Sequence, residues 1–172
     1  ASKQIKWKSG SKTDIIFQLV GRADSQAPDH IEGYWLKLEE GTIHVKARSE
    51  GGFFYAIQTL KQILDKSINN EIPQCTIVDY PSLNNRGLMD DISRGPLPSV
   101  RFAKEQIRRL SAMKYNLFTF YIEHVVKTKQ HGSFAPEEGL TIAEIEELSA
   151  YAQLHNMQLA GSYQSLGQFN NI

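Results

Sequence analysis

The chain has 172 residues, and its 41% hydrophobic and 22% charged residues are the ordinary composition of a globular protein. Lysine and arginine together number 19, as do aspartate and glutamate, so the formal net charge of zero provides no basic field to attract nucleic acid or an anionic membrane. No apolar run in the sequence approaches the roughly 18 residues of a membrane-spanning helix. Cys75 is the single cysteine, which excludes a disulfide framework within the chain.

Three strands are predicted in the first 50 residues. The β-forming run at residues 14–20 (DIIFQLV) is typical of a strand. Residues 34–39 (YWLKLE) and 42–47 (TIHVKA) each alternate apolar and polar side chains, which is the period of a half-buried strand. Gly41 lies between these two runs, so we expect a tight connection that joins them into an antiparallel hairpin.

A helix, a further strand and a domain boundary follow the hairpin. Helical spacing over residues 53–66 predicts one buried face, formed by Phe54, Ile57, Leu60, Ile63 and Leu64. Residues 74–79 (QCTIVD) predict a short strand. Residues 80–82 (YPS) indicate a boundary, because proline removes a hydrogen-bond donor from a strand and forces an extended approach.

The second half of the chain alternates strands with helices. Residues 86–92, 116–122 and 158–161 have strand character, and residues 100–113 and 141–155 between them have helical periodicity. This alternation is the βαβ pattern of a parallel sheet, for which right-handed crossovers are expected.

The two predicted helices of this half carry specific signals. The first should bury a stripe formed by Phe102, Ile107, Leu110 and Met113. The second begins with a capping box, in which Thr141 is followed three residues later by Glu144. A defined start for this helix is therefore predicted.

Five short segments carry a resemblance to a known family. Residues 32–36 (EGYWL) and 52–60 (GFFYAIQTL) lie on the predicted hairpin and helix, residues 77–81 (IVDYP) lie at the boundary, and residues 86–94 (RGLMDDISR) and 113–116 (MKYN) lie in the second half. Together they resemble the accessory domain, linker and first barrel strands of family 20 glycoside hydrolases, the β-N-acetylhexosaminidases. The resemblance covers most of the chain from about residue 30 onward.

The resemblance implies an α/β fold in two parts. Residues 1–80 would form a small two-layer α+β accessory domain, and residues 81–172 the first three βα units of a (β/α)8 TIM barrel. A complete barrel needs eight strands over roughly 200 to 250 residues. We therefore expect a truncated barrel, and the chain to be a piece of a larger enzyme.

Substrate contacts are implied for three residues of the first two barrel strands. The family's arginine at the position of Arg86 binds the 3- and 4-hydroxyls of the terminal sugar, a role that suits a planar fork of five donors; pairing with a structural carboxylate is the alternative. Glu123 and His124 end the second strand, at the face where barrel active sites lie. The family has Thr-Asp-Asp there, so this chain has a carboxylate shifted by one position. We interpret this as a rebuilt sugar-contact loop, with a solvated loop pair as the alternative.

Two glutamines after the third strand are further candidates. Gln164 and Gln168 replace an aspartate and a histidine of the family, so they could hold a sugar hydroxyl but could not carry a proton; loop-backbone contacts are equally compatible with them. Asp90 and Asp91 are consecutive in a strand and should point to opposite faces, so they cannot act as a glycosidase pair. We expect Asp91 to pair with Arg94 or a neighbouring helix.

The family's mechanism is a substrate-assisted retaining hydrolysis of terminal N-acetylhexosamine, in which an aspartate orients the acetamido group and a glutamate is the general acid. That Asp-Glu pair is expected beyond residue 172, so no catalytic residue is assigned and this chain alone is expected to be inactive. No cofactor or metal is expected, since the sequence has no His-Glu-x-x-His run. A non-catalytic carbohydrate-binding or interaction module, or a barrel glycosidase of another family, remains the alternative.

Partners and location follow from the same reasoning. An N-acetylhexosamine-containing glycan is the expected ligand, with no nucleic acid and no membrane insertion. The family implies a secreted or periplasmic parent protein, although the chain opens with a polar segment and no signal peptide. Because a truncated barrel leaves an open edge, we expect a homodimer that covers residues 158–161 or the barrel-side face of Phe118 and Phe120.

Overall fold

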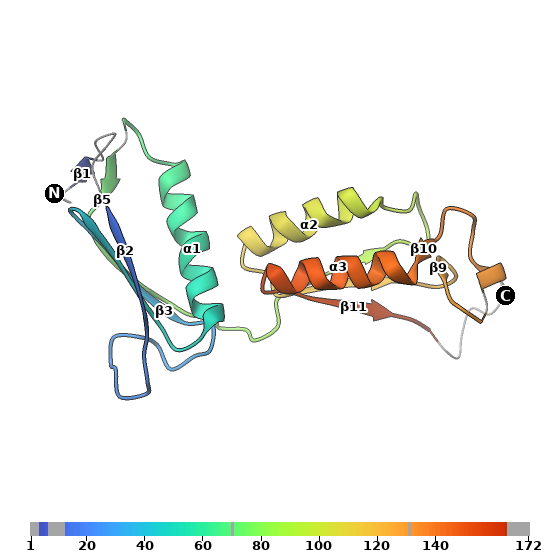
Figure 1. Cartoon of the computed structure of the whole chain (residues 1–172), viewed down its shortest axis with the longest axis horizontal. Coiled ribbons are helices and arrows are strands. Elements are labelled where there is room, and N and C mark those ends of the chain that lie inside the picture. Colours follow the sequence, from blue (N-terminus) through green and yellow to red (C-terminus); the bar gives the residue numbers. More distant parts are fainter. Residues whose placement is uncertain (1–3, 7–12, 70, 131, 165–172) are drawn as a thin grey trace. The chain divides into compact units, whose positions relative to one another are not determined.

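The computed structural model describes residues 4–6, 13–69, 71–130 and 132–164 (Figure 1). The chain divides into two compact units, Ala1–Asn84 and Asn85–Ile172. The domain boundary expected from the sequence follows residue 80, and the junction of the two units follows Asn84. Within the described residues, no helix combines the length and the apolar character that crossing a membrane requires.

A four-stranded sheet forms the first unit, in the order β2 (Asp14–Leu19), β4 (Thr42–Ala47), β3 (Tyr34–Glu39) and β6 (Cys75–Asp79). Strands β3 and β4 pair in antiparallel fashion and form the predicted hairpin, with the bounds that alternation indicated. Strand β2 pairs with β4 in parallel and β6 pairs with β3 in antiparallel fashion. Gly41 turns the hairpin with a φ of 77°, a left-handed conformation that favours glycine.

Helix α1 (Glu50–Asp65) begins at Ser49, whose side chain accepts a hydrogen bond from the backbone N–H of Gly52. Five of its residues are buried: Gly52, Tyr55, Ala56, Gln58 and Leu60. The buried face predicted from the sequence was therefore partly wrong, since Ile57 and Leu64 are exposed. Small residues decide the face, because Gly52 lets the helix backbone approach Gly33 closely enough that a Cβ atom would lie 2.4 Å from its carbonyl oxygen.

The helix covers the middle of the sheet more than its β2 edge. The side chains of β3 and β4 that face α1 are buried in a core cluster formed by Tyr34, Leu36, Leu38, Ile43, Val45, Ala47, Tyr55, Ala56, Leu60 and Ile72. On β2, Phe17 makes an edge-to-face contact with Phe53 of α1, yet it stays 46% exposed. A separate pair of short strands, β1 (Gln4–Lys6) and β5 (Glu71–Pro73), completes the unit.

Three parallel strands form the sheet of the second unit, in the order β11 (Gln158–Ser162), β8 (Leu117–Tyr121) and β7 (Gly87–Asp91). Helix α2 (Val100–Ala112) connects β7 to β8, and helix α3 (Ile142–Leu154) lies between β8 and β11 in the sequence. The predicted βαβαβ alternation and the parallel pairing are confirmed. The two helices contact each other and lie on the same side of this sheet (Figure 1).

The helix-facing side of this sheet is well packed. Phe118 and Phe120 are 0% and 2% exposed and belong to the core formed with both helices. The expectation that these two phenylalanines form an open barrel-side face was therefore wrong, because alternation along β8 turns them toward the helices. The opposite side of the sheet carries Met89, which is 58% exposed, so the uncovered side belongs to the other set of alternating residues.

The stripe predicted for α2 was also partly wrong. Ile107 and Leu110 are buried as expected, but Phe102 and Met113 are exposed, while Ala103 and Ser111 are buried in their place. The periodicity of large apolar residues does not mark these two small side chains.

The loop between β8 and α3 contains three short elements. Strands β9 (Val126–Lys127) and β10 (Leu140–Thr141) pair in parallel, and the 3-10 helix η1 (Gly132–Phe134) lies between them. The predicted capping box of α3 is confirmed, with both reciprocal hydrogen bonds between Thr141 and Glu144 present.

Replacing Gly52 by alanine tests the close approach of α1 to the sheet. Alanine is normally favoured over glycine in a helix by about 1 kcal/mol. Here its Cβ would lie 2.4 Å from the Gly33 carbonyl oxygen and 2.7 Å from the Ala47 Cβ. We expect Gly52→Ala to lower the free energy of unfolding by about 1–3 kcal/mol, measured by urea denaturation.

The matched control is Gly21→Ala, where an added Cβ has no neighbour within 4 Å. That variant should leave the free energy of unfolding close to the starting value. A stabilising effect of Gly52→Ala would contradict the packing described for α1.

Candidate functional site

The carboxyl ends of the three parallel strands form one edge of the second unit's sheet. Asp91, Tyr121 and Ser162 are the last residues of β7, β8 and β11, and Asp91 and Ser162 each pair directly with Tyr121 in the ladder. Two further backbone hydrogen bonds, from Ile92 to Tyr121 and from Ile122 to Ser162, continue the pairing past the strand ends. The loops that follow therefore leave the sheet side by side.

Arg94 links two of these loops through its guanidinium group. Its Nη1 donates to Asp91 Oδ2 at 2.6 Å, and its Nη2 donates to Glu123 Oε1 at 2.9 Å. The Tyr121 hydroxyl donates to the same Glu123 oxygen at 3.1 Å, and the guanidinium carbon lies 5.3 Å from the centre of the Tyr121 ring. We call Asp91, Arg94, Tyr121 and Glu123 the edge cluster.

The turn after β7 holds Asp91 in place within this cluster. Its Oδ1 accepts hydrogen bonds from the backbone N–H of Ser93 at 3.0 Å and from the Ser93 hydroxyl at 2.6 Å. The pKa of the Asp91 carboxyl lies below its ordinary value. The hydrogen bond from the Ser93 hydroxyl has the largest effect, and the hydrogen bond from Arg94 adds to it. Pairing with Asp91 in turn raises the pKa of the Arg94 guanidinium. The expected pairing of Asp91 with Arg94 is thus confirmed.

Glu123 and His124 lie where the sequence placed them, directly after β8. The Glu123 side chain is only 16% exposed, whereas that of Arg94 is 51% exposed. The edge cluster therefore has a largely buried carboxylate and a guanidinium group that solvent can reach. The Nδ1 atom of His124 is buried and has no hydrogen-bond partner within the described part of the chain. Buried polar atoms are normally paired, so this imidazole retains an unused hydrogen-bonding capacity next to the edge cluster.

Arg86 lies at the other end of β7. It precedes the strand, its Nε donates to the Lys114 carbonyl oxygen at 2.7 Å, and its backbone N–H donates to Asn116 Oδ1 at 2.8 Å. Because a strand rises about 3.3 Å per residue, Arg86 lies about 16 Å from Asp91 at the other end of β7. The structure therefore does not bring Arg86 together with Glu123 and His124. The sugar contact of Arg86 stays a prediction, and the place of Arg86 before β7 does not favour it.

Of the two candidate glutamines, the structure describes Gln164 but not Gln168. Gln164 is exposed and follows β11, at the same edge of the sheet as the edge cluster. Gln168 lies outside the described residues. Asp90 accepts a hydrogen bond from Gln106 Nε2 of α2 at 3.3 Å, so it faces the helices. Asp91, the next residue of the strand, faces the opposite side of the sheet. The expectation that these two aspartates point to opposite faces is confirmed.

Arg94 is the residue that sequence reasoning missed as a site candidate. The expectation treated it only as a partner of Asp91, although it follows directly after a strand whose carboxyl end lies at the active face of a barrel. Its place after β7, together with the carboxylate after β8, was the available signal.

The edge cluster has the chemistry of a hydrogen-bonding surface. It combines two carboxylates with one guanidinium, so at neutral pH it carries more negative than positive charge and does not suit an anionic ligand. Carboxylate oxygens accept and guanidinium N–H groups donate, which together match the hydroxyl groups of a neutral sugar. Across residues 4–6, 13–69, 71–130 and 132–164, no three His, Cys, Asp or Glu side chains gather to hold a metal ion.

Comparison with protein families and known sequences gives a consistent result. Residues 1–80 match the model of glycosyl hydrolase family 20, domain 2. Beta-hexosaminidase B of Pseudoalteromonas piscicida is 29% identical over 143 residues, which cover 81% of this chain and 16% of that protein. The beta subunit of beta-hexosaminidase from Homo sapiens is 29% identical over 126 residues, which cover 72% of this chain and 21% of that protein. The chain thus spans only a small part of the length of these relatives.

Solved structures agree with the sequence relatives. The GH20 beta-N-acetylhexosaminidase from Streptomyces coelicolor A3(2) superposes with a TM-score of 0.74 at 25% sequence identity, covering 86% of this chain and 33% of that chain. The likeness therefore extends over both units of the chain, beyond the residues that the family model matches.

Replacing Ser93 by alanine tests the hydrogen bonds that hold Asp91. Without the hydroxyl donor, the pKa of Asp91 should rise toward the ordinary aspartate value of about 3.9. The measurement is a carbon-detected NMR titration of the side-chain carboxyl, with Ser133→Ala as the control that leaves the pKa unchanged.

The same shift in the pKa of Asp91 should make the free energy of unfolding depend on pH. A folded-state pKa below the unfolded-state value contributes stability above the unfolded-state pKa, and this contribution is lost as the pH falls through the folded-state pKa. The stability difference between wild type and Ser93→Ala should therefore shrink as the solution is acidified. An Asp91 pKa that does not move in Ser93→Ala would contradict the described geometry.

Proposed function

Because this chain belongs to glycoside hydrolase family 20, we propose that it is part of a β-N-acetylhexosaminidase-like enzyme that removes terminal N-acetylhexosamine from glycans. The first unit is its accessory domain, and the second unit provides the first three strands of its catalytic barrel. The observation that supports a sugar-binding role most directly is the edge cluster, in which Arg94 joins two strand-end loops through Asp91 and Glu123.

The barrel proposal is supported by the parallel sheet of the second unit. Its three strands are parallel and two helices cover one side of it, as in a (β/α)8 barrel, where helices form the outer ring. The other side would face the barrel interior. Relatives several times longer than this chain have length enough for the remaining strands.

In this proposal, the edge cluster contacts the hydroxyl groups of the terminal sugar. Arg94 offers donors and Glu123 offers acceptors at the carboxyl edge of the sheet, where barrel enzymes bind substrate. His124 and Gln164 lie at the same edge and would extend these contacts, and Gln168 is proposed with them from the sequence alone. Arg94 thereby takes the role that the sequence suggested for Arg86.

Hydrolysis itself would depend on residues outside this chain. The family's substrate-assisted mechanism uses the acetamido oxygen of the substrate as the nucleophile, so it departs from the usual two-carboxylate scheme. An aspartate that orients the acetamide and a glutamate that donates the proton are still needed. We accordingly propose that the 172-residue chain is inactive alone.

Two further proposals come from the sequence. The parent protein is secreted or periplasmic, and a homodimer covers the open edge at β11.

Kinetics of the longer natural protein test this function. On an aryl N-acetylglucosaminide, Arg94→Gln should lower kcat/KM by about 10- to 100-fold, because hydrogen bonds from a charged donor contribute roughly 1.5–3 kcal/mol. The matched control is Arg108→Gln, since Arg108 lies on the exposed surface of α2, where its guanidinium group pairs with Glu105.

Two results would contradict the proposal. Absence of hydrolysis by the folded longer protein, with binding of N-acetylglucosamine retained, would show a carbohydrate-binding module instead of an enzyme. Loss of activity in a folded Arg86→Gln variant, with Arg94→Gln fully active, would place the sugar contact at the other end of β7.

A further inference from the structure

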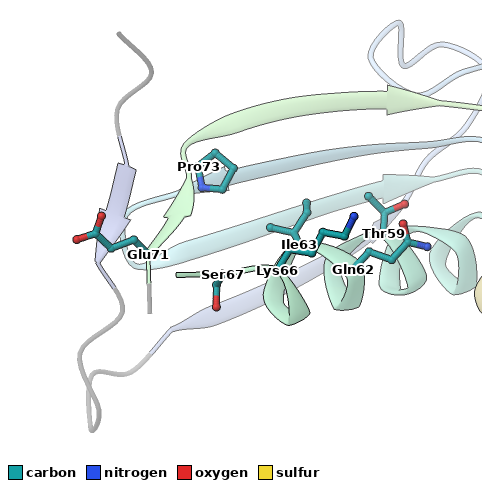
Figure 2. A pocket seen from close by; sticks show the side chains of 7 residues that line it. All are labelled: Thr59, Gln62, Ile63, Lys66, Ser67, Glu71 and Pro73. Carbon is teal, nitrogen blue, oxygen red and sulfur yellow. The ribbon is translucent and has the colours of Figure 1, made fainter. Parts of the chain in front are cut away.

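The first unit contains a pocket of about 350 Å³, on the side of α1 that faces β5. Figure 2 shows its wall: Thr59 and Ile63 lie along α1, Lys66 and Ser67 follow at the end of the helix, and Pro73 stands opposite on β5. This volume lies within the range of small-ligand sites, about 300–1,000 Å³. The pocket is separate from the edge cluster, which belongs to the second unit.

Buried hydrogen bonds determine what the Thr59 hydroxyl can offer to a ligand. Tyr34 is 1% exposed, and its hydroxyl donates to Asp79 Oδ2 at 2.9 Å. A tyrosine hydroxyl has one proton, so in its 2.6 Å contact with Thr59 the tyrosine oxygen must accept. The proton of Thr59 is thus directed inward, and its oxygen keeps lone pairs that can accept from a donor.

The end of the helix offers the complementary group. Lys66 is exposed, lines the pocket and carries three N–H donors. Thr59 and Lys66 are seven residues apart, about two helical turns or 10 Å. A ligand that spans them needs a donor at one end and oxygen acceptors at the other.

The rest of the wall limits the class of ligand further. Glu71 lines the pocket as well as Lys66, so the lining carries one charge of each sign and does not favour a strongly charged ligand. Ile63 and Pro73 provide apolar surface between the polar groups. A neutral ring with hydroxyl or amide donors, oxygen acceptors and C–H faces fits this lining, and these are the features of a sugar residue.

We propose that this pocket is an ancillary carbohydrate-binding site on the accessory unit, which takes one neutral sugar residue of a glycan. The Thr59 oxygen accepts a hydroxyl or acetamido N–H of the sugar, Lys66 donates to its oxygens, and the C–H face of the ring packs on Ile63 and Pro73. The site binds glycan and takes no part in hydrolysis.

Proton–nitrogen correlation NMR of the 172-residue chain tests the proposal. Titration with N-acetylglucosamine and with its β1,4-linked dimer should shift the backbone amides of Ile63, Lys66 and Ser67, while glycerol at the same concentration should not. Lys66→Gln should weaken binding roughly tenfold, the cost of losing a charged donor. Lys61→Gln is the matched control, because Lys61 is an exposed lysine of α1 that is not among the residues lining the pocket.

A second pair of variants tests Thr59. Thr59→Ser keeps the hydroxyl and should bind as wild type does, whereas Thr59→Val removes the acceptor and should lose binding; if Thr59→Val does not fold, the lysine pair decides. Absence of shifts up to the solubility limit of the sugars, or equal shifts with glycerol, would overturn the site. Shifts confined to residues around Arg94 would also overturn it and would leave the proposed function standing.

Discussion

The register of β7, β8 and β11 is the constraint on which the candidate site depends. In this ladder Asp91 pairs with Tyr121, which pairs with Ser162, so the three loops that follow begin in one row. Arg94 can then reach both Asp91 and Glu123 with one guanidinium group. A shift of one residue in either pairing would turn every side chain of that strand to the other face of the sheet and would separate these groups.

The edge cluster is arranged for orientation more than for stability. Exposed ion pairs contribute between nothing and about 1 kcal/mol, and both Arg94 and Asp91 are well exposed. Nearby, the His124 Nδ1 and Gln106 Oε1 atoms are buried without hydrogen-bond partners in the part of the chain described, which costs stability. The packed helices and the phenylalanines of β8 supply the stability that this edge does not.

The sequence predicted the elements better than their faces. Alternation identified the hairpin, and the Thr141–Glu144 spacing identified the start of α3, because both signals are local. The buried faces of α1 and α2 were partly wrong, since Gly52 and Ala103 pack closely against neighbours that a helical period does not contain. The site was incomplete for a related reason: the sequence places Arg94 after β7 and Glu123 after β8, but only the pairing of the two strands shows that one guanidinium group joins them.

A crystal structure of the longer natural protein with N-acetylglucosamine bound tests the central claim most directly. We expect eight strands in a closed barrel, with β7, β8 and β11 as consecutive strands. We also expect Arg94 and Glu123 to lie within hydrogen-bonding distance of the hydroxyl groups of the bound sugar. A barrel that does not include these strands, or a sugar in the catalytic site bound away from Arg94 and Glu123, would contradict it.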